Sequence, residues 1–269
     1  MSYTHISVER NYHDKIATIT MRRPEVHNAF NAQLLQDLQA AFTDLRTDTH
    51  LHAVVLTGEG PSFSAGADIG TMKDAAAFTK EQNMGDALRL ANLFDTINSF
   101  PCPVVARVNG AAMGGGAGLV SVCDIVIAVE SAKLAFSEVK LGIAPAVISP
   151  YVIRKIGETH ARVLFVTGER FSAARAREIG LVHIVVSAEE LDAAVEKTLR
   201  ELLSSGPQAM HACKILASSV GRMEKGEARF YTTKTIAELR VSEEGQEGLR
   251  SFLEKRKPNW ITGDSHQHG

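Results

Sequence analysis

Cysteine, long apolar runs and excess charge of either sign are all scarce in this chain. Its 269 residues contain three cysteines, which fit neither a disulfide framework nor a zinc site (Cys102, Cys123 and Cys213). No uncharged run reaches the ~18 residues of a membrane span, and residues 1–15 lack the apolar stretch of a signal peptide. The 29 Lys and Arg against 31 Asp and Glu give a formal charge of −2, which does not favour nucleic acid or anionic membranes. We therefore expect a cytoplasmic protein with reduced thiols and with neither nucleic-acid nor membrane partners.

Several common catalytic and nucleotide-binding motifs are absent as well. A dinucleotide fingerprint that starts at Gly114 would need a third glycine where the chain has Leu119. The sequence contains no Gly-Lys-Ser/Thr phosphate loop, no HExxH and no G-x-S-x-G nucleophile elbow. We expect neither a bound metal nor a separate cofactor.

The composition, with 45% hydrophobic and 22% charged residues, is that of a globular chain. Short runs rich in β-branched residues alternate with helical patterns over its first part. The expected strands are Ile16–Met21, His52–Thr57, Pro103–Val108 and Ile125–Val129. Between the first two, apolar residues recur on one helical face up to Leu45, with Asn31 placed to cap the helix. This alternation predicts a layered α/β domain.

The pattern changes near residue 188, after which only helical signals follow. The expected helices are Ala188–Leu203, Pro207–Val220, Ala228–Leu239 and Ser242–Lys257. We therefore predict an α/β core over residues 1–187, a helical region over 188–260 and a disordered tail over 261–269. Such a helical region either covers the core or holds subunits together, and we favour assembly.

Two glycine-rich turns, Gly58–Asp68 (GEGPSFSAGAD) and Asn109–Gly118 (NGAAMGGGAG), each follow an expected strand. Glycines let a backbone approach a ligand closely and leave its amide N–H groups accessible. Two such turns could direct two N–H groups at one oxygen, which is the geometry of an oxyanion hole. The alternative for Gly114–Gly116 is tight helix packing.

Three carboxylates are candidates for acid–base chemistry. Glu138 lies within an apolar segment, so it is either a capping residue or a desolvated acid/base whose pKa burial would raise. Asp68 is placed to cap the next helix, with a direct role as the less favoured alternative. Asp124 stands at a strand start and we expect it to be structural.

Five segments together resemble the enoyl-CoA hydratase/isomerase (crotonase) superfamily, and they span nearly the whole chain. In order they are SFSAGAD, VARVNGAAMGGGAGLVSVCDIVIA, AFSEVKLGIAP, TGERFSAARAREIGLV and FLEKRKPNW. The resemblance implies a spiral core of ββα units and C-terminal helices that build trimers, often paired into hexamers. It also implies an acyl-CoA thioester substrate.

By position, the resemblance makes the amides of Ala67 and Gly115 the oxyanion hole for the thioester carbonyl and Glu138 the acid/base. Five further residues would contact the substrate. Ala65, Asp68 and Ile69 would line the coenzyme A channel, and the other two are Gly114 and Gly118. The basic end of the last helix, at Lys255 or Lys257, could meet coenzyme A phosphates, although a solvated helix end is the favoured interpretation.

The sequence departs from the usual hydratases at Gly118, where they carry the first of two glutamates. Either Glu138 alone shuttles a proton, as in family members that move a double bond, or it handles both protons of a hydration with a water held by an unidentified group. The run SEVKLGIAPAVISPYV resembles bacterial hydratases of 3-methylglutaconyl-CoA, from leucine breakdown, and of isohexenylglutaconyl-CoA. Gly70 and Thr71 depart from that subgroup.

The leading hypothesis is therefore a hydro-lyase that hydrates a 2-enoyl-CoA, including 3-methylglutaconyl-CoA as a candidate. A Δ3–Δ2 enoyl-CoA isomerase is the alternative, and a non-catalytic acyl-CoA- or RNA-binding protein is a weaker one. A glutaconyl substrate carries a distal carboxylate that needs a cation in the pocket, for which Arg89, Lys140 and Arg154 are candidates.

Overall fold

The computed structural model describes residues 3–11 and 15–262, and within these the core is a six-stranded sheet with a four-stranded sheet beside it. The large sheet has the order β1-β2-β3-β5-β7-β10. Strands β1 and β2 are antiparallel, and every later neighbouring pair is parallel. Its strands are β1 (Ile6–Asn11), β2 (Ile16–Met21), β3 (Ala53–Gly58), β5 (Val104–Val108), β7 (Ile125–Val129) and β10 (Ile184–Val186).

The smaller sheet consists of very short strands in the order β4-β6-β8-β9. They are β4 (Ser62–Ser64), β6 (Ala111–Met113), β8 (Lys133–Ala135) and β9 (Arg170–Ser172). Strand β6 pairs parallel with β4 on one side and with β8 on the other, while β9 is antiparallel to β8. Because β4, β6 and β8 run in the same direction, their carboxyl ends lie along one edge.

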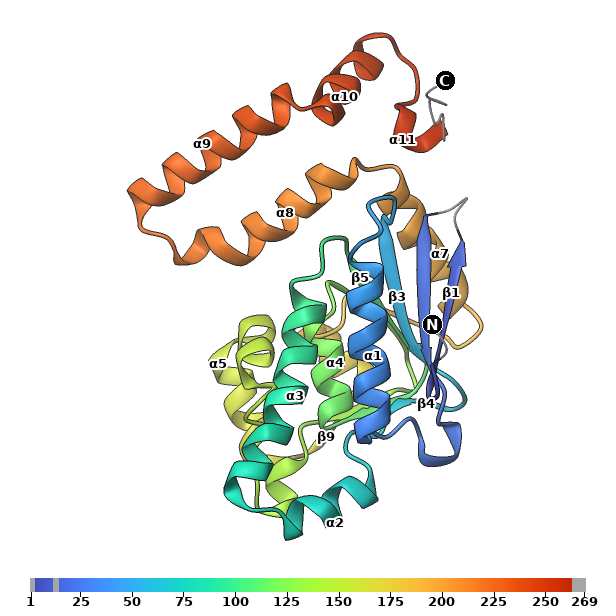
Figure 1. Cartoon of the computed structure of the whole chain (residues 1–269), viewed down its shortest axis with the longest axis vertical. Helices are drawn as coiled ribbons and strands as arrows, with labels where there is room; N and C mark the ends of the chain where they lie inside the picture. The colour runs from blue at the N-terminus through green and yellow to red at the C-terminus, as the bar shows by residue number, and fades with distance from the viewer. Residues whose placement is uncertain (1–2, 12–14, 263–269) are drawn as a thin grey trace.

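Helices cover the sheets and connect their strands (Figure 1). Those of the body are α1 (Ala32–Leu45), α2 (Ile69–Ala77), α3 (Lys80–Asn98), α4 (Gly115–Val122), α5 (Ser149–Thr167), α6 (Ala173–Glu178) and α7 (Leu191–Leu203), with 3-10 turns η1 (Pro24–Val26) and η2 (Glu138–Leu141). Helix α1 begins where the Asn31 side chain accepts a hydrogen bond from the Leu34 N–H at 2.8 Å. It buries Leu34, Leu38 and Phe42 completely, as the helical spacing predicts.

The last helices form a separate layer at one end of the molecule, opposite to α2 (Figure 1). They are α8 (Pro207–Ser219), α9 (Lys225–Val241), α10 (Glu243–Leu253) and α11 (Asn259–Thr262), with the 3-10 turn η3 (Val220–Arg222). Helix α7 precedes this layer and packs on the core through Leu191 and Val195. Lys214 of α8 pairs with Asp124 of the body at 2.7 Å. The last strand, β10, thus ends just before the predicted boundary at residue 188. The helical layer that projects from the body begins later, at α8.

The α/β architecture and the predicted core strands are confirmed, with end points that differ by at most one residue. The predicted last helix was too long, because α10 ends at Leu253 and Lys255 takes a left-handed conformation (φ 54°). Residues 261 and 262 belong to α11, and residues 263–269 of the predicted tail lie outside the described residues. Among the helices of the described part, none has the length and apolar character to cross a membrane.

Candidate active site

Three parallel strands end at the same edge of the small sheet, and each delivers one part of the predicted site. Strand β4 leads into Ala65–Asp68, which we call the first turn. Strand β6 leads into Gly114–Gly118, the second turn, and β8 is followed by Glu138. The Gly114 N–H donates to the Ala135 carbonyl at 2.9 Å, which ties the second turn to the end of β8. Ligand sites commonly lie at the carboxyl ends of parallel strands. Residues from three distant parts of the sequence are therefore brought to one place.

The first turn lies directly against the second. Gly66 has a positive φ of 84°, and a Cβ atom there would lie 2.6 Å from the Met113 carbonyl oxygen and 3.3 Å from the Gly115 nitrogen. Only glycine combines this backbone conformation with such a close approach. The two turns that the sequence suggested as amide donors are thus in contact.

The N–H group of Ala67 has no hydrogen-bond acceptor among the described residues. Backbone hydrogen bonds hold both neighbours, because the Phe30 N–H donates to the Gly66 carbonyl at 2.6 Å and the Asp68 N–H donates to the Phe30 carbonyl at 2.9 Å. Within residues 3–11 and 15–262, no acceptor binds the Ala67 N–H. Ala67 is exposed, so this donor is open to a ligand.

The second donor is the N–H of Gly115, the first residue of α4. The first N–H groups of a helix have no partner within the helix, and the helix dipole makes this end attractive to negative charge. Its neighbour Gly114 has a φ of 49° and serves as the N-cap without a side chain. Two unpaired N–H groups on touching turns can stabilise an oxygen that becomes negatively charged.

Glu138 begins the 3-10 turn η2 and lies against the second turn. Its Oε1 atom is 3.4 Å from the position that a Cβ atom of Gly114 would occupy. Its Oε2 atom is buried, and no described residue provides it with a hydrogen-bond partner. Burial raises the pKa of the Glu138 carboxyl, and a hydrogen bond from its own backbone N–H offsets part of this effect. A carboxylate with a raised pKa and a free oxygen is suited to proton transfer.

Gly118, one turn further along α4, has no open space beside it. A Cβ atom there would lie 2.4 Å from Cγ2 of Ile148 and 2.9 Å from Cζ of Phe94. Both side chains are buried, and Phe94 also packs edge-on against Tyr151, with ring centroids 6.2 Å apart. The place where, by the resemblance, the usual hydratases carry the first of their two glutamates is therefore filled by apolar side chains. A role of Gly118 in substrate contact stays a prediction and would require these side chains to move.

Asp68 has a structural role that the sequence suggested. Its side chain caps α2 by accepting from the Gly70 N–H at 2.7 Å, and it pairs with Arg23 at 3.0 Å. Ala65, the first residue of the first turn, and Ile69, which follows the turn, are exposed. Asp124 is held between the Val104 N–H and Lys214, in keeping with the structural role expected for it.

The three cationic candidates for a distal carboxylate lie on different elements and are all exposed. Arg89 pairs with Asp86 on its own helix at 2.8 Å, and Lys140 and Arg154 are exposed. Lys255 and Lys257 follow α10, at the end of the molecule opposite to α2 (Figure 1). Within one subunit these two lysines therefore lie far from the two turns.

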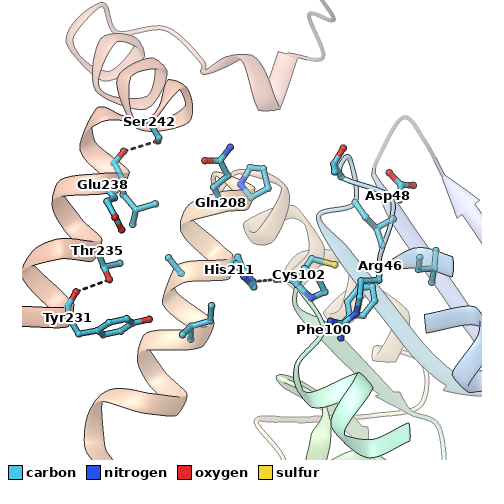
Figure 2. Close-up of a pocket in the computed structure, with 18 residues that line it drawn as sticks. Arg46, Asp48, Phe100, Cys102, Gln208, His211, Tyr231, Thr235, Glu238 and Ser242 are labelled. Carbon is cyan, nitrogen blue, oxygen red and sulfur yellow. Dashed lines mark hydrogen bonds between the residues drawn. The ribbon is translucent and has the colours of Figure 1, made fainter. Parts of the chain in front are cut away.

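A cavity of about 800 Å³ separates α8 and α9 from the body. Figure 2 shows it with Arg46 and Phe100 on the side of the body and Tyr231 and Glu238 on α9. The 14-residue helix α1, about 21 Å long, runs from the first turn to this cavity. Because the cavity lies at the far end of α1, it is no part of the amide and carboxylate site.

Three residues that shape this site were not predicted from the sequence: Arg23, Phe94 and Ile148. Arg23 is 45 positions before its partner Asp68, and nothing local indicates that pairing. The close fit of Phe94 and Ile148 around Gly118 depends on how α3, α4 and α5 pack. Their only sequence signal is the absence of a side chain at position 118.

The chain is similar to known proteins over nearly its full length. A sequence model of the enoyl-CoA hydratase/isomerase family matches residues 11–263. The crotonyl-CoA hydratase of Syntrophomonas wolfei is 34% identical over 264 residues, covering 97% of this chain and 100% of the relative.

Solved structures agree with this assignment. A Legionella pneumophila protein assigned to the enoyl-CoA hydratase/isomerases (crotonases) is 44% identical with a TM-score of 0.90, covering 96% of this chain and 100% of that one. The enoyl-CoA hydratase of Shewanella pealeana is 40% identical with a TM-score of 0.91, covering 96% of both chains. The predicted α/β crotonase fold is confirmed, and the chain belongs to the enoyl-CoA hydratase/isomerase family.

Proposed function

We propose that this protein is a hydro-lyase that adds water to the double bond of a 2-enoyl-CoA thioester. The observation that carries this proposal is the position of the Glu138 carboxylate against the turn that presents the Gly115 N–H. The N–H groups of Ala67 and Gly115 bind the thioester oxygen, and Glu138 supplies and removes protons. The names of the similar hydratases support the same reaction class.

In this mechanism Glu138 takes a proton from a water molecule, whose oxygen forms a bond to C3 of the substrate. The electron pair of the C2–C3 double bond moves toward the thioester and places negative charge on its oxygen. The two N–H groups stabilise this enolate, and each donor of this kind contributes ~2.7–4 kcal/mol. Protonated Glu138 then returns a proton to C2, which completes the addition of water.

A Δ3–Δ2 enoyl-CoA isomerase is the second candidate. The packing of Phe94 and Ile148 around Gly118 favours it, because it leaves a single carboxylate at the site. One base suffices to remove a proton from C2 of a 3-enoyl-CoA and return it to C4. Both reactions pass through the same enolate, so the same two N–H groups serve either.

The acyl chain is the finer part of the proposal. The resemblance to bacterial methylglutaconyl-CoA and isohexenylglutaconyl-CoA hydratases supports a branched acid. The exposed positions of Arg89, Lys140 and Arg154 give a distal carboxylate no buried partner in this subunit. We therefore keep 3-methylglutaconyl-CoA as one arm of the test and crotonyl-CoA, which has no second carboxylate, as the other.

The test follows the loss of enoyl-thioester absorbance when the protein is added to crotonyl-CoA or to 3-methylglutaconyl-CoA. A loss that disappears in Glu138→Gln supports hydration by this carboxylate. If neither thioester loses absorbance, the hydratase proposal is wrong. Formation of a 2-enoyl thioester from 3-hexenoyl-CoA would then identify an isomerase.

We also propose that the chain acts as a homotrimer or a pair of trimers. Large apolar side chains are exposed on α9 and α10, including Phe230 (71%), Val241 (77%) and Phe252 (81%). An isolated chain rarely leaves so many apolar side chains in water. Light scattering on the purified protein would give a mass of three or six chains, and a monomer mass would contradict the proposal.

A further inference from the structure

Arg23 lies between β2 and η1, close to the first turn, and its side chain is only 11% exposed. Its guanidinium group makes two contacts. Nη1 donates a hydrogen bond to the Ala29 carbonyl at 2.6 Å, and Nη2 lies 3.0 Å from Oδ2 of Asp68. Arg23 therefore joins the segment before α1 to the residue that follows Ala67.

Together with two backbone hydrogen bonds, these contacts close a ring around Ala67. Ala29 is followed by Phe30, whose N–H and carbonyl bind Gly66 and Asp68 on either side of Ala67. The Asp68 carboxylate completes the ring by returning to Arg23. The peptide that carries the Ala67 N–H is thus held through the residues on either side of Ala67.

The backbone of Arg23 is held by hydrogen bonds with Asn28. The Arg23 N–H donates to Oδ1 of Asn28 at 2.9 Å, and the Asn28 N–H donates to the Arg23 carbonyl at 2.8 Å. The Asn28 side chain is completely buried. These bonds hold the backbone of Arg23, and the contacts with Ala29 and Asp68 hold its guanidinium group.

This arrangement is costly if stability is its only purpose. The Nε–H of Arg23 is buried, and none of the described residues accepts its hydrogen bond. Leaving a charged group's N–H unpaired in the interior carries a desolvation penalty, and buried ion pairs often add little net stability. Their better-supported contribution is to select one geometry.

We propose that Arg23 is a positioning residue that fixes the direction of the Ala67 N–H toward the thioester oxygen. The inference rests on the proposed function, because it assigns Arg23 a role in the same oxyanion hole. Arg23 does not touch the substrate, and it acts through Asp68 and the carbonyl of Ala29. Lysine cannot replace it, since a single ammonium group does not reproduce the planar fork that makes both contacts.

The expected effect is a loss of transition-state stabilisation with little loss of binding. Removing an oxyanion donor costs 10²–10³-fold in kcat, so a misdirected donor should cost about 10- to 100-fold. Coenzyme A contacts elsewhere are unchanged, so KM should stay within about threefold. The losses in Arg23→Gln and Asp68→Asn should not add, because both variants break the same ring.

The experiment compares Arg23→Gln, Arg23→Lys and Asp68→Asn with the control Arg22→Gln. Arg22 is the neighbouring arginine and pairs with Glu59 on the surface, where the two side chains are 55% and 45% exposed. The control therefore removes the same charge one residue away without touching the ring. Each variant is assayed for kcat, KM and melting temperature.

The deciding readout is the absorbance of bound 2,4-hexadienoyl-CoA. Its conjugated thioester should absorb at longer wavelength when the two N–H groups polarise the carbonyl. We expect a red shift in the wild type and in Arg22→Gln, and a smaller one in the three other variants at saturating ligand. A role in stability alone would lower the melting temperature and leave the red shift unchanged.

The outcomes separate this inference from the proposed function. A wild-type red shift and kcat that persist in folded Arg23→Lys and Asp68→Asn would overturn the role of Arg23 while leaving the oxyanion hole in place. If Arg23→Gln fails to fold, these two milder variants still decide the question. A wild type that binds hexadienoyl-CoA without any red shift would overturn the oxyanion hole, and the role of Arg23 with it.

Discussion

The two turns that present N–H groups are built in opposite ways. The turn at Ala65–Asp68 is partly exposed and is held by polar contacts, chiefly the Arg23–Asp68 pair and the backbone hydrogen bonds of Phe30. The turn at Gly114–Gly118 has hardly any side chains and is held by close packing. A Cβ atom at Gly116, for example, would lie 2.4 Å from the Ser64 carbonyl oxygen.

This difference predicts which substitutions each turn tolerates. Changes in charge or hydrogen bonding at the first turn should alter the direction of the Ala67 N–H without unfolding the protein. The second turn should respond to volume, because each added atom meets backbone or buried side chains. A single oxygen bound by both turns would then depend on two unrelated kinds of interaction.

The largest expected effect comes from Glu138→Gln, which changes neither turn. General acid–base catalysis contributes about 10²–10⁴-fold, so kcat on the preferred enoyl-CoA should fall by that range. The red shift of bound 2,4-hexadienoyl-CoA should remain, because both N–H donors are intact. A variant that lost the red shift as well would show that the carboxylate also holds the turns in place.

The pH profile gives a check on the same residue. Because burial raises the pKa of Glu138, the acid limb of kcat/KM in the wild type should lie above the ordinary glutamate value of about 4.3. Activity that needs the ionised base falls as the pH drops through this raised pKa. The residual activity of Glu138→Gln should lack this limb, and an identical limb in both proteins would assign it to another group.

The next effect tests the packed turn through Gly118→Glu. The new side chain would overlap Ile148 and Phe94 and would place a carboxylate among apolar groups. Overpacking alone costs about 1–3 kcal/mol, and an unpaired buried charge adds to this loss. Urea unfolding should therefore show a loss of about 3 kcal/mol or more.

Adding Ile148→Ala to this variant sharpens the test. Alone, Ile148→Ala should cost about 2–5 kcal/mol by leaving a cavity. Combined with Gly118→Glu it supplies the missing space, so the double variant should be more stable than the sum of the two losses by at least about 1 kcal/mol. Purely additive losses would show that the two positions do not compete for space.

A smaller change of the same kind is Gly116→Ala, which adds one methyl group against the backbone of β4. We expect a loss of about 1–3 kcal/mol, because a strand carbonyl cannot rotate away as a side chain can. Gly85→Ala in α3 is the matched control, since nothing outside its own helix backbone and chain neighbours lies within 4 Å of the added Cβ. That control should gain about 0.4–1 kcal/mol from reduced freedom of the unfolded chain. If Gly116→Ala and the control variant lost the same amount of stability, close packing at Gly116 would not be the cause.

The packed turn is also the part of the site that sequence reasoning could recover. Consecutive glycines after a strand are needed for close backbone approach, so Gly114 and Gly115 were visible as a candidate donor site. Glu138 was visible because it is an acidic residue within an apolar segment. The strands β2 and β7 were predicted with their observed bounds, because runs of β-branched residues favour strands.

What the sequence did not reveal is the sheet that joins these parts. Strands β4, β6 and β8 have three residues each, too few for any periodicity to show. The contacts of the first turn were hidden for a similar reason. Arg23 and Asp68 meet beside the bridge between Phe30 and Ala67, and both contacts depend on tertiary structure.

The smallest expected effect is that of Asp68→Asn on stability. Burial raises the pKa of Asp68, but the hydrogen bond from the Gly70 N–H and the Arg23 guanidinium outweigh this and hold the pKa below its ordinary value. Asparagine keeps the side-chain oxygen that accepts from the Gly70 N–H and leaves a neutral hydrogen-bond partner beside Arg23, so the variant should lose about 1 kcal/mol at pH 7.

The pH dependence of this loss distinguishes an ionic contact from simple packing. A carboxylate with a lowered pKa contributes stability above its unfolded value of about 3.9, and that contribution disappears as the pH falls through the folded pKa. The melting temperatures of wild type and Asp68→Asn should therefore differ at pH 7 and converge below about pH 4. A difference that stayed constant down to pH 3 would mean that the first turn, like the second, is held by shape rather than by charge.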